Sequence, residues 1–344
     1  MAFFAVTLER IAEIYPHPNA DRLELAKVAG LAFQFCIRKG DYAVGDEVLY
    51  FPIDSLLPTA IIDKLGIGNM LAGAQRNRVK TVQLRGQISQ GLVARPATLL
   101  DVDPHGVDLT AHLGVTKYEP PETFAASGIL TVLPTGLGVY DIEGADRFVR
   151  ALELLMDQLV VITEKLEGTN HATVLTETGD KVVCQRGNAI VELPDVENTY
   201  CKVARDHGLL EFLDRVPHGP GQLVALRGEL IGPSIQKNIY ALKKPEVRIF
   251  DVRVGHKYLD AGQWLAVVPE RWRVPVLASG VTLREWLNGR TIQQAADGPS
   301  TLSAHLREGI VVRPMTEQLA DFGDGHLQRL ILKQRSPLYL AKEE

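Results

Sequence analysis

The chain has 344 residues, of which 46% are hydrophobic, and it carries a formal net charge of −5. A chain of this length can bury a sizeable core and suggests two domains. The net negative charge argues against a protein that coats nucleic acid indiscriminately, although it leaves room for a local basic groove.

The cysteines are few, and no two of them form a C-x-x-C pair; they are Cys36, Cys184 and Cys201. Such a set fits small buried thiols in a reduced, cytoplasmic protein better than a disulfide framework or a zinc site. The opening segment MAFFAVTLERIAE has too short an apolar run for a signal peptide. No uninterrupted apolar stretch approaches the roughly 20 residues of a membrane helix, so we expect no membrane segment.

The first part of the chain reads as short strands separated by turn signals. The segment DRLELAKVAG alternates, and a turn at Gly45-Asp46 leads into an apolar strand. A second, hairpin-like break falls at Arg85-Gly86. Short strands at this spacing suggest a small barrel, which we assign to residues 1–120. The periodicity then fades, so residues 121–143 are expected to form a linker.

A different pattern begins near Glu143. The segment GADRFVRALELLMDQL predicts an amphipathic helix packed on a core, because apolar residues recur on one helical face. These residues are Phe148, Leu152, Leu155 and Leu159. A helix is expected within VENTYCKVARDHGLLEFLDRV, and strands in HATVLTE, KVVCQRG, GQLVALRGELIG, EVRIFDVRV, EGIVVRP and LQRLILKQRS. Residues 144–344 therefore indicate an α+β domain built largely on antiparallel sheet.

One lysine raises a chemical question. Lys165 follows the apolar run QLVV, which is typical of a buried strand, and stands between Glu164 and Glu167. A lysine in water has a pKa of about 10.4, so it is a poor nucleophile near neutral pH unless its surroundings activate it. The pattern K-x-[D/E]-G occurs by chance in about 1 of every 6 chains of this length. Taken alone, it describes a solvated surface lysine paired with a neighbouring acid.

Six short motifs in a fixed order favour the reactive interpretation. They are KLEGTN with Lys165, CQRG with Arg186, RGELIG with Glu229, RIFDVRV with Phe250 and Asp251, EGIVVRP with Glu308, and LILKQRS with Lys333 and Arg335. Each motif is weak alone, but the ordered set resembles the covalent nucleotidyltransferase superfamily of ATP-dependent DNA and RNA ligases and messenger RNA capping enzymes. This resemblance spans residues 165–335.

Further features resemble one branch of that superfamily. The sequence GTN after the lysine motif resembles that of RNA ligases that seal duplex nicks, in which an asparagine follows the motif. Only nine residues follow Arg335 (344 − 335 = 9), so we expect no carboxy-terminal OB domain of the kind found in DNA ligases and capping enzymes. The amino-terminal segment HPNADRLELAKV resembles the opening hairpin of OB-fold transfer-RNA-binding modules. The whole chain thus resembles ATP-dependent RNA ligases of the fifth class.

The resemblance implies an amino-terminal OB-fold barrel followed by an ATP-grasp-like nucleotidyltransferase domain. It also implies an enzyme that seals 3′-OH/5′-phosphate nicks in duplex nucleic acid in three steps. Lys165 attacks ATP to give lysyl-AMP and pyrophosphate, AMP passes to the 5′-phosphate, and the 3′-hydroxyl then expels AMP. By resemblance we expect ribonucleotides on the 3′-OH side of the nick and a role in RNA repair.

The same resemblance implies a divalent cation, Mg²⁺ or Mn²⁺, held by Glu167 and Glu308. Carboxylates suit a hard cation that also binds phosphate and water. One departure is Glu167, because the commonest motif has aspartate there. Another is Arg335, where lysine is frequent.

Three cations are expected to stabilise the phosphates during transfer: Arg186, Lys333 and Arg335. Lys333 and Arg335 stand two apart in a strand-like run, so both side chains should point to one face. Arg329 fits a solvated strand face better.

Nucleotide binding is expected to use these catalytic groups and a further set. The further set comprises Glu164, Thr169, Asn170, Glu229 and Phe250. Phe250 would stack on adenine, Glu229 would accept a hydrogen bond from a ribose hydroxyl, and Glu164 or its backbone would read the adenine amino group. Thr169 and Asn170 would touch or position the nick phosphate.

The amino-terminal barrel offers a candidate nucleic-acid surface. Arg76, Arg78 and Lys80 alternate, so a strand there would present three cations on one side that could follow a phosphate backbone. A solvated edge strand guarded by charge explains the same pattern equally well. We expect the barrel to bind duplex beside the nick and to help orient the 3′ strand.

Two other functions remain open from the sequence. One is a non-catalytic RNA- or transfer-RNA-binding protein with a decayed transferase domain, which the complete motif order disfavours. The other is a capping-type guanylyltransferase, which the expected lack of a carboxy-terminal OB domain disfavours.

Overall fold

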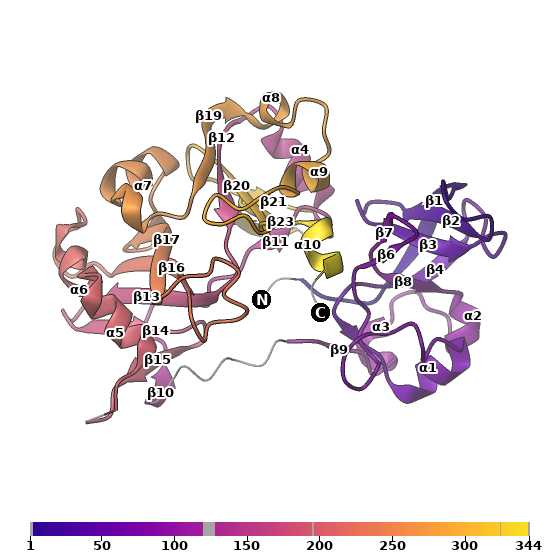
Figure 1. The fold of residues 1–344 in the computed structure, drawn as a ribbon, viewed down its shortest axis with the longest axis horizontal. Coiled ribbons are helices and arrows are strands. Elements are labelled where there is room, and N and C mark those ends of the chain that lie inside the picture. The colour runs from indigo at the N-terminus through magenta and orange to yellow at the C-terminus, as the bar shows by residue number, and fades with distance from the viewer. Residues whose placement is uncertain (1–2, 120–127, 195, 324, 343–344) are drawn as a thin grey trace. The chain divides into compact units, whose positions relative to one another are not determined.

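The computed structural model describes residues 3–119, 128–194, 196–323 and 325–342 (Figure 1). The chain divides into two compact units. Of the described residues, the smaller unit includes 3–119, 143–149 and 337–342, and the larger unit includes 128–142 and 150–336. Part of the predicted linker, residues 121–127, lies outside the described residues.

The smaller unit is built on a five-stranded antiparallel sheet. In spatial order its strands are β3 (Gln34–Arg38), β2 (Leu23–Val28), β1 (Thr7–Pro16), β4 (Glu47–Phe51) and β8 (Leu92–Ala94). Two strand pairs accompany it, β5 (Ser55–Leu56) with β9 (Thr116–Lys117) and β6 (Val82–Leu84) with β7 (Gln87–Ser89). The helices are α1 (Thr59–Leu65), α2 (Pro96–Leu99), α3 (Leu109–His112) and α10 (Pro337–Lys342).

The strand β4 is buried on both faces. Val48 and Tyr50 pack into one apolar cluster, while Leu49 and Phe51 pack into another. Successive side chains of a strand point to opposite faces, so β4 joins two core layers. The turn predicted at Gly45-Asp46 leads directly into this strand.

The predicted hairpin break at Arg85-Gly86 joins β6 and β7. Arg85 has φ 44° and Gly86 has φ 89°. Two consecutive left-handed residues match the two-residue turn whose twist suits a hairpin.

The strand expected to carry Arg76, Arg78 and Lys80 does not form, so that prediction is wrong. Arg76 lies in a turn with φ 49°, and Arg78 forms only isolated bridges. The Arg78 guanidinium donates to Asp54 at 2.6 Å and lies 3.7 Å from the centre of the Tyr118 ring. These local contacts outweigh the alternating pattern, and the three cations do not share a strand face.

The larger unit contains a seven-stranded antiparallel sheet. In spatial order its strands are β10 (Ile129–Val132), β15 (Asn188–Val191), β14 (Lys181–Cys184), β13 (Thr169–Leu175), β16 (Val224–Ile231), β17 (Glu246–Val254) and β18 (Lys257–Tyr258). Four more strands pair in the order β23 (Leu332–Arg335), β20 (Gly309–Pro314), β12 (Leu159–Lys165) and β19 (Val276–Thr282). The remaining strands of this unit are β21 (Leu319–Asp321) and β22 (Leu327–Arg329), whereas β11 (Glu143–Gly144) belongs to the smaller unit.

Helices of the larger unit cover the seven-stranded sheet and flank the four-stranded group (Figure 1). They are α4 (Val149–Leu155), α5 (Thr199–Asp206), α6 (Leu209–Phe212), α7 (Ala261–Val267), α8 (Leu283–Leu287), α9 (Ile292–Ala296), and the 3₁₀ turns η1 (Leu213–Arg215) and η2 (Glu270–Trp272). Tyr200 and Val203 of α5 pack in one core with Leu226 of β16 and Ile249 of β17. No helix in the described part of the chain is both long and apolar enough to cross a membrane.

The helix predicted to include Leu159 is shorter than expected. It ends at Leu155, whereas Leu159 begins β12 and is 54% exposed. Leu159 pairs with Thr282 of β19, so strand pairing outweighs the helical spacing at this point. The three cysteine thiols are free, with Cys184 and Cys201 buried and Cys36 half-buried.

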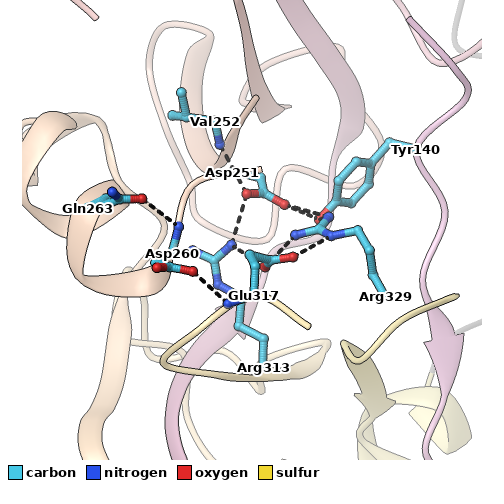
Figure 2. Close-up of polar contacts among 8 residues, drawn as sticks. All are labelled: Tyr140, Asp251, Val252, Asp260, Gln263, Arg313, Glu317 and Arg329. Atoms are coloured by element: carbon cyan, nitrogen blue, oxygen red, sulfur yellow. Dashed lines mark hydrogen bonds and ion pairs between the residues drawn. The ribbon is translucent and has the colours of Figure 1, made fainter. Parts of the chain in front are cut away.

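A buried charge network ties β17 to β20 (Figure 2). The fully buried Asp251 accepts hydrogen bonds from Arg313 at 2.9 Å and from the Tyr140 hydroxyl at 2.7 Å. Arg329 lies 2.9 Å from the second Asp251 oxygen and also pairs with Glu317 at 2.7 Å. The network therefore connects the seven-stranded sheet, the four-stranded group and β22 at one point.

The prediction that Arg329 lies on a solvated strand face is wrong. Its side chain is 20% exposed, and its guanidinium lies 3.6 Å from the centre of the Tyr258 ring. Burial lowers the pKa of Arg329, but Asp251, Tyr140 and Glu317 together outweigh that effect and raise the pKa above its ordinary value. The alternating pattern of a short strand does not show that the Asp251 carboxylate lies on the face that the pattern assigns to solvent.

We expect Asp251→Asn to destabilise the protein by about 3 kcal/mol, because two arginines would lose a buried counter-charge. Chemical denaturation at equilibrium measures the change in the free energy of unfolding. Asp157→Asn is the matched control, because Asp157 pairs with Arg284 at 2.7 Å with both side chains exposed. Removing that exposed surface pair should change the free energy of unfolding far less. Equal effects of the two substitutions would contradict the role given to Asp251.

Candidate active site

Lys165 lies at the last position of β12, where the buried strand ends. Its Nζ donates a hydrogen bond to Glu308 Oε2 at 2.6 Å. The Lys165 side chain is 25% exposed and that of Glu308 is 12% exposed. The amine is thus held by a carboxylate at the rim of the sheet, yet a substrate can still reach it. The prediction of a lysine at the end of a buried strand is confirmed.

Two glycines, Gly168 and Gly309, allow close approach of neighbouring strands at the lysine and glutamate motifs. A Cβ on Gly168 would lie 2.4 Å from the Leu230 carbonyl oxygen, and one on Gly309 would lie 2.1 Å from that of Gln334. No side chain fits at either distance, so only glycine allows β13 to approach β16 and β20 to approach β23. The acids next to these glycines, Glu167 and Glu308, are placed by this close approach.

The strand register brings further predicted residues to Lys165. Lys165 lies opposite Gly309, which lies opposite Arg335 on its other side. Arg335 Nε is 3.8 Å from Glu308 Oε1. Burial raises the pKa of Glu229 to about 8, with Lys165 opposing the shift and Glu308 adding to it. Four groups from distant parts of the sequence therefore form one electrostatic cluster.

Asp141 joins two of the predicted cations. Its carboxylate accepts a hydrogen bond from Arg186 at 2.9 Å and lies 3.7 Å from Lys333 Nζ. Along β23, Lys333 and Arg335 are partly exposed, whereas the alternate residues Leu332 and Gln334 are buried. The pair shares one face of β23, as predicted. Asp141 was missed, because it lies in the segment expected to be a linker and no motif marks it.

Glu164 points away from Lys165, as successive residues of a strand do. Its side chain is 1% exposed, and Oε2 accepts hydrogen bonds from the Thr301 amide at 2.9 Å and hydroxyl at 2.8 Å. The other oxygen, Oε1, is buried and has no hydrogen-bond partner among the described residues. Thr301 is a second residue that the sequence did not reveal.

The rest of the lysine motif is fixed by two tyrosines. The Glu167 amide donates to the Tyr240 hydroxyl at 2.6 Å, and the Thr169 hydroxyl lies 3.0 Å from that of Tyr200. Burial raises the pKa of Tyr240, so its hydroxyl stays neutral. Asn170 lies directly opposite Glu229 in the β13–β16 ladder.

Phe250 is half-buried on β17, and its ring centre is 5.0 Å from that of Tyr140. The Tyr140 hydroxyl donates a hydrogen bond to Asp251, and this bond fixes the orientation of the Tyr140 ring (Figure 2). One aromatic side chain thus buttresses the other.

The carboxylates of the site suit a metal ion that also binds substrate phosphates and water. Within the described ranges no group of three or more His, Cys, Asp or Glu side chains converges. Magnesium commonly binds one or two carboxylates together with substrate phosphates and water, and Glu167 and Glu308 supply carboxylates of that kind. The donor chemistry therefore fits Mg²⁺ or Mn²⁺.

Comparison with known proteins gives the family. A family model described as RNA ligase matches residues 158–333, just over half of the chain. This chain belongs to the RNA ligase family. A second model, an OB-fold domain, matches residues 5–96 of the amino-terminal part. A search of curated protein sequences found no match.

Solved structures of Naegleria gruberi RNA ligase resemble the whole RNA ligase chain. A structure with PPi has 27% identity and a TM-score of 0.79, covering 99% of each chain. A mutant with AMP and Mn also has 27% identity and a TM-score of 0.79, and one with ATP and Mn has 27% and 0.78; both cover 98% of each chain. The predicted α+β fold, an amino-terminal OB-fold followed by a nucleotidyltransferase domain, is confirmed.

We expect Glu229→Gln to stabilise the protein in a pH-dependent way. The folded-state pKa of about 8 exceeds the ordinary 4.5, so the native state retains a proton that the unfolded chain releases. Wild-type stability should therefore fall as pH rises from 4.5 through about 8, while the glutamine variant lacks this loss.

Thermal or denaturant unfolding from pH 4 to 9 measures the gap between variant and wild type. It should be near zero at the acidic end and approach about 5 kcal/mol above pH 8, which is the free-energy equivalent of a pKa shift from 4.5 to about 8. A gap that does not change with pH would contradict the raised pKa.

Proposed function

We propose that this RNA ligase uses ATP to seal 3′-OH/5′-phosphate nicks in duplex nucleic acid through a lysyl-AMP intermediate. The observation that carries the proposal is the placement of Lys165 Nζ, 2.6 Å from Glu308 and beside Glu229 and Arg335. The relatives with ATP, AMP, PPi and Mn support it, because they bind the substrate, a product and the cation that this reaction needs.

The first step forms a phosphoramidate. The Lys165 ammonium loses a proton, the neutral amine attacks the α-phosphorus of ATP, and the bond to the leaving pyrophosphate breaks. Glu308 holds the ammonium before the reaction and is the nearest proton acceptor. When Mg²⁺ or Mn²⁺ is bound by Glu167 and Glu308, its charge favours the neutral amine and offsets that of the phosphates.

Fixed cations serve all three steps, because each step concentrates negative charge at phosphorus. Arg186 and Lys333 are oriented by Asp141, and Arg335 by Glu308. A phosphate group that enters the site can replace the Asp141 carboxylate as their partner. The two cations then need little reorganisation when the phosphate charge develops.

Base recognition favours adenine. Phe250, buttressed by Tyr140, offers a ring for stacking. Glu164, or the backbone beside it, can accept a hydrogen bond from the adenine amino group, whereas guanine would present a carbonyl oxygen there. Glu229, largely neutral below pH 8, keeps a carbonyl oxygen that can accept from a ribose hydroxyl.

The nucleic-acid substrate is proposed from the motif and the added domain. Thr169 and Asn170 follow Gly168 at the start of β13 and would position the nick phosphate. The OB-fold unit would bind the duplex beside the nick. Ribonucleotides at the 3′-OH end are the expected requirement.

Incubation with α-labelled ATP or GTP and Mn²⁺ tests the proposal. We expect an acid-labile labelled protein with ATP alone, because the Glu164 carboxylate repels the guanine carbonyl. Lys165→Ala should abolish labelling, while Lys202→Ala, a paired surface lysine, should leave it unchanged. The labelled protein should then seal a nick with a 3′-ribonucleotide at least about tenfold faster than one with a 3′-deoxynucleotide.

The other functions predict different results. A capping-type guanylyltransferase would be labelled by GTP. A non-catalytic RNA-binding protein with a decayed transferase domain would show no adduct with either nucleotide. Either result would contradict the proposal.

A further inference from the structure

The loop between β16 and β17, residues 232–245, has an unusual charge. Its sequence is GPSIQKNIYALKKP, with three lysines and no acidic residue, in a chain whose net charge is −5. Lys237, Lys243 and Lys244 are all exposed. No residue that the structure describes forms an ion pair with their ammonium groups. The loop therefore presents a local excess of three positive charges.

The backbone of this loop is strained. Four of its non-glycine residues adopt left-handed conformations: Ser234 with φ 64°, Gln236 with φ 45°, Asn238 with φ 45° and Ala241 with φ 52°. Such conformations are uncommon for residues with a Cβ, and they persist only where the surroundings enforce them. Strained segments of this kind concentrate at binding and catalytic sites.

Buried anchors hold the loop in this shape. Ile235 is 1% exposed and Tyr240 is 4% exposed, and both belong to the main core of the unit. The Asn238 side chain donates to the Leu242 carbonyl oxygen and accepts from the Leu242 amide, each at 3.1 Å. The lysines thus extend from a frame that is already ordered, which lowers the entropic cost of binding through them.

The same loop contacts the nucleophile motif directly. The Tyr240 hydroxyl accepts a hydrogen bond from the Glu167 amide at 2.6 Å, and the Lys237 amide donates to Glu167 Oε1 at 3.4 Å. Glu167 is two residues from Lys165. Lys237 therefore lies beside the reactive centre, and Lys243 and Lys244 follow where the chain returns to β17.

We propose that the loop of residues 232–245 binds the phosphate backbone of the nucleic acid next to the nick, through Lys237, Lys243 and Lys244. The contacts are to phosphates, so they do not depend on base sequence. This inference rests on the proposed function, since it places the polyanion at the same site. The side chains of these three lysines take no part in the proposed reaction with ATP.

The test compares two triple variants of the full chain with equal charge changes. One is Lys237→Ala/Lys243→Ala/Lys244→Ala, and the control is Lys181→Ala/Lys202→Ala/Lys257→Ala, which changes other lysines of the same unit. Labelling with ATP is measured first, and thermal unfolding checks that each variant folds. Binding to a nicked duplex is then measured from about 50 to 200 mM salt with two unrelated sequences.

We expect the loop variant to be labelled by ATP at the wild-type rate and to bind both duplexes at least about tenfold more weakly. Its plot of log affinity against log salt should be less steep by about 2 to 3, because each lost phosphate contact removes roughly 0.9 from the slope. The charge-matched control should change both quantities far less.

Duplex affinity and salt slope equal to those of wild type would overturn the proposal. So would the same loss in the control, which would indicate net charge alone, or a folded loop variant with slower labelling, which would assign the lysines to ATP. If the wild-type protein is not labelled by ATP, the proposed function is refuted. The duplex-binding data would still show whether the loop lysines bind phosphates.

Discussion

The register of three neighbouring strands is the constraint on which the site depends. Lys165 of β12, Gly309 of β20 and Arg335 of β23 lie side by side. The glycine in the middle lets β23 approach so closely that no side chain would fit. The proposed nucleophile Lys165, its acidic partner Glu308 and the cation Arg335 are thereby brought together by backbone pairing. A shift of one residue in any strand would send one of these side chains to the opposite face.

The buried network around Asp251 holds the strands and side chains next to this arrangement in place. It joins β17, which carries Phe250, to β20, which follows Glu308. Tyr140 bonds to Asp251 and packs on Phe250, and the next residue, Asp141, orients Arg186 and Lys333. One buried carboxylate therefore holds Tyr140 against Phe250 and lies one residue from the acid that pairs with Arg186 and Lys333.

The sequence predicted the features that local pattern can encode. Lys165 at a buried strand end and the common face of Lys333 and Arg335 follow from periodicity, and the ordered motifs indicated the family. Asp141 and Thr301 could not be found in this way. Their partners lie 45 and 137 residues away, and a single acid or threonine outside a motif carries no signal of such a contact.

The predictions that failed did so where a partner overrode a local pattern. Leu159 fits the spacing of the preceding helix, but pairing with β19 draws it into a strand. Arg78 alternates with its neighbours, but Asp54 and Tyr118 hold it outside any strand. Arg329 looks solvated, but Asp251 draws it inward. In each case the decisive group is distant in sequence or invisible to periodicity.

In the proposed reaction, Lys165 is the residue that accepts AMP. The most direct measurement is mass spectrometry of the protein after incubation with ATP and Mn²⁺, with the adduct located by peptide mapping under alkaline conditions. We expect a single added AMP on the peptide that contains Lys165. An adduct on another residue, such as Lys333 or a loop lysine, would contradict it.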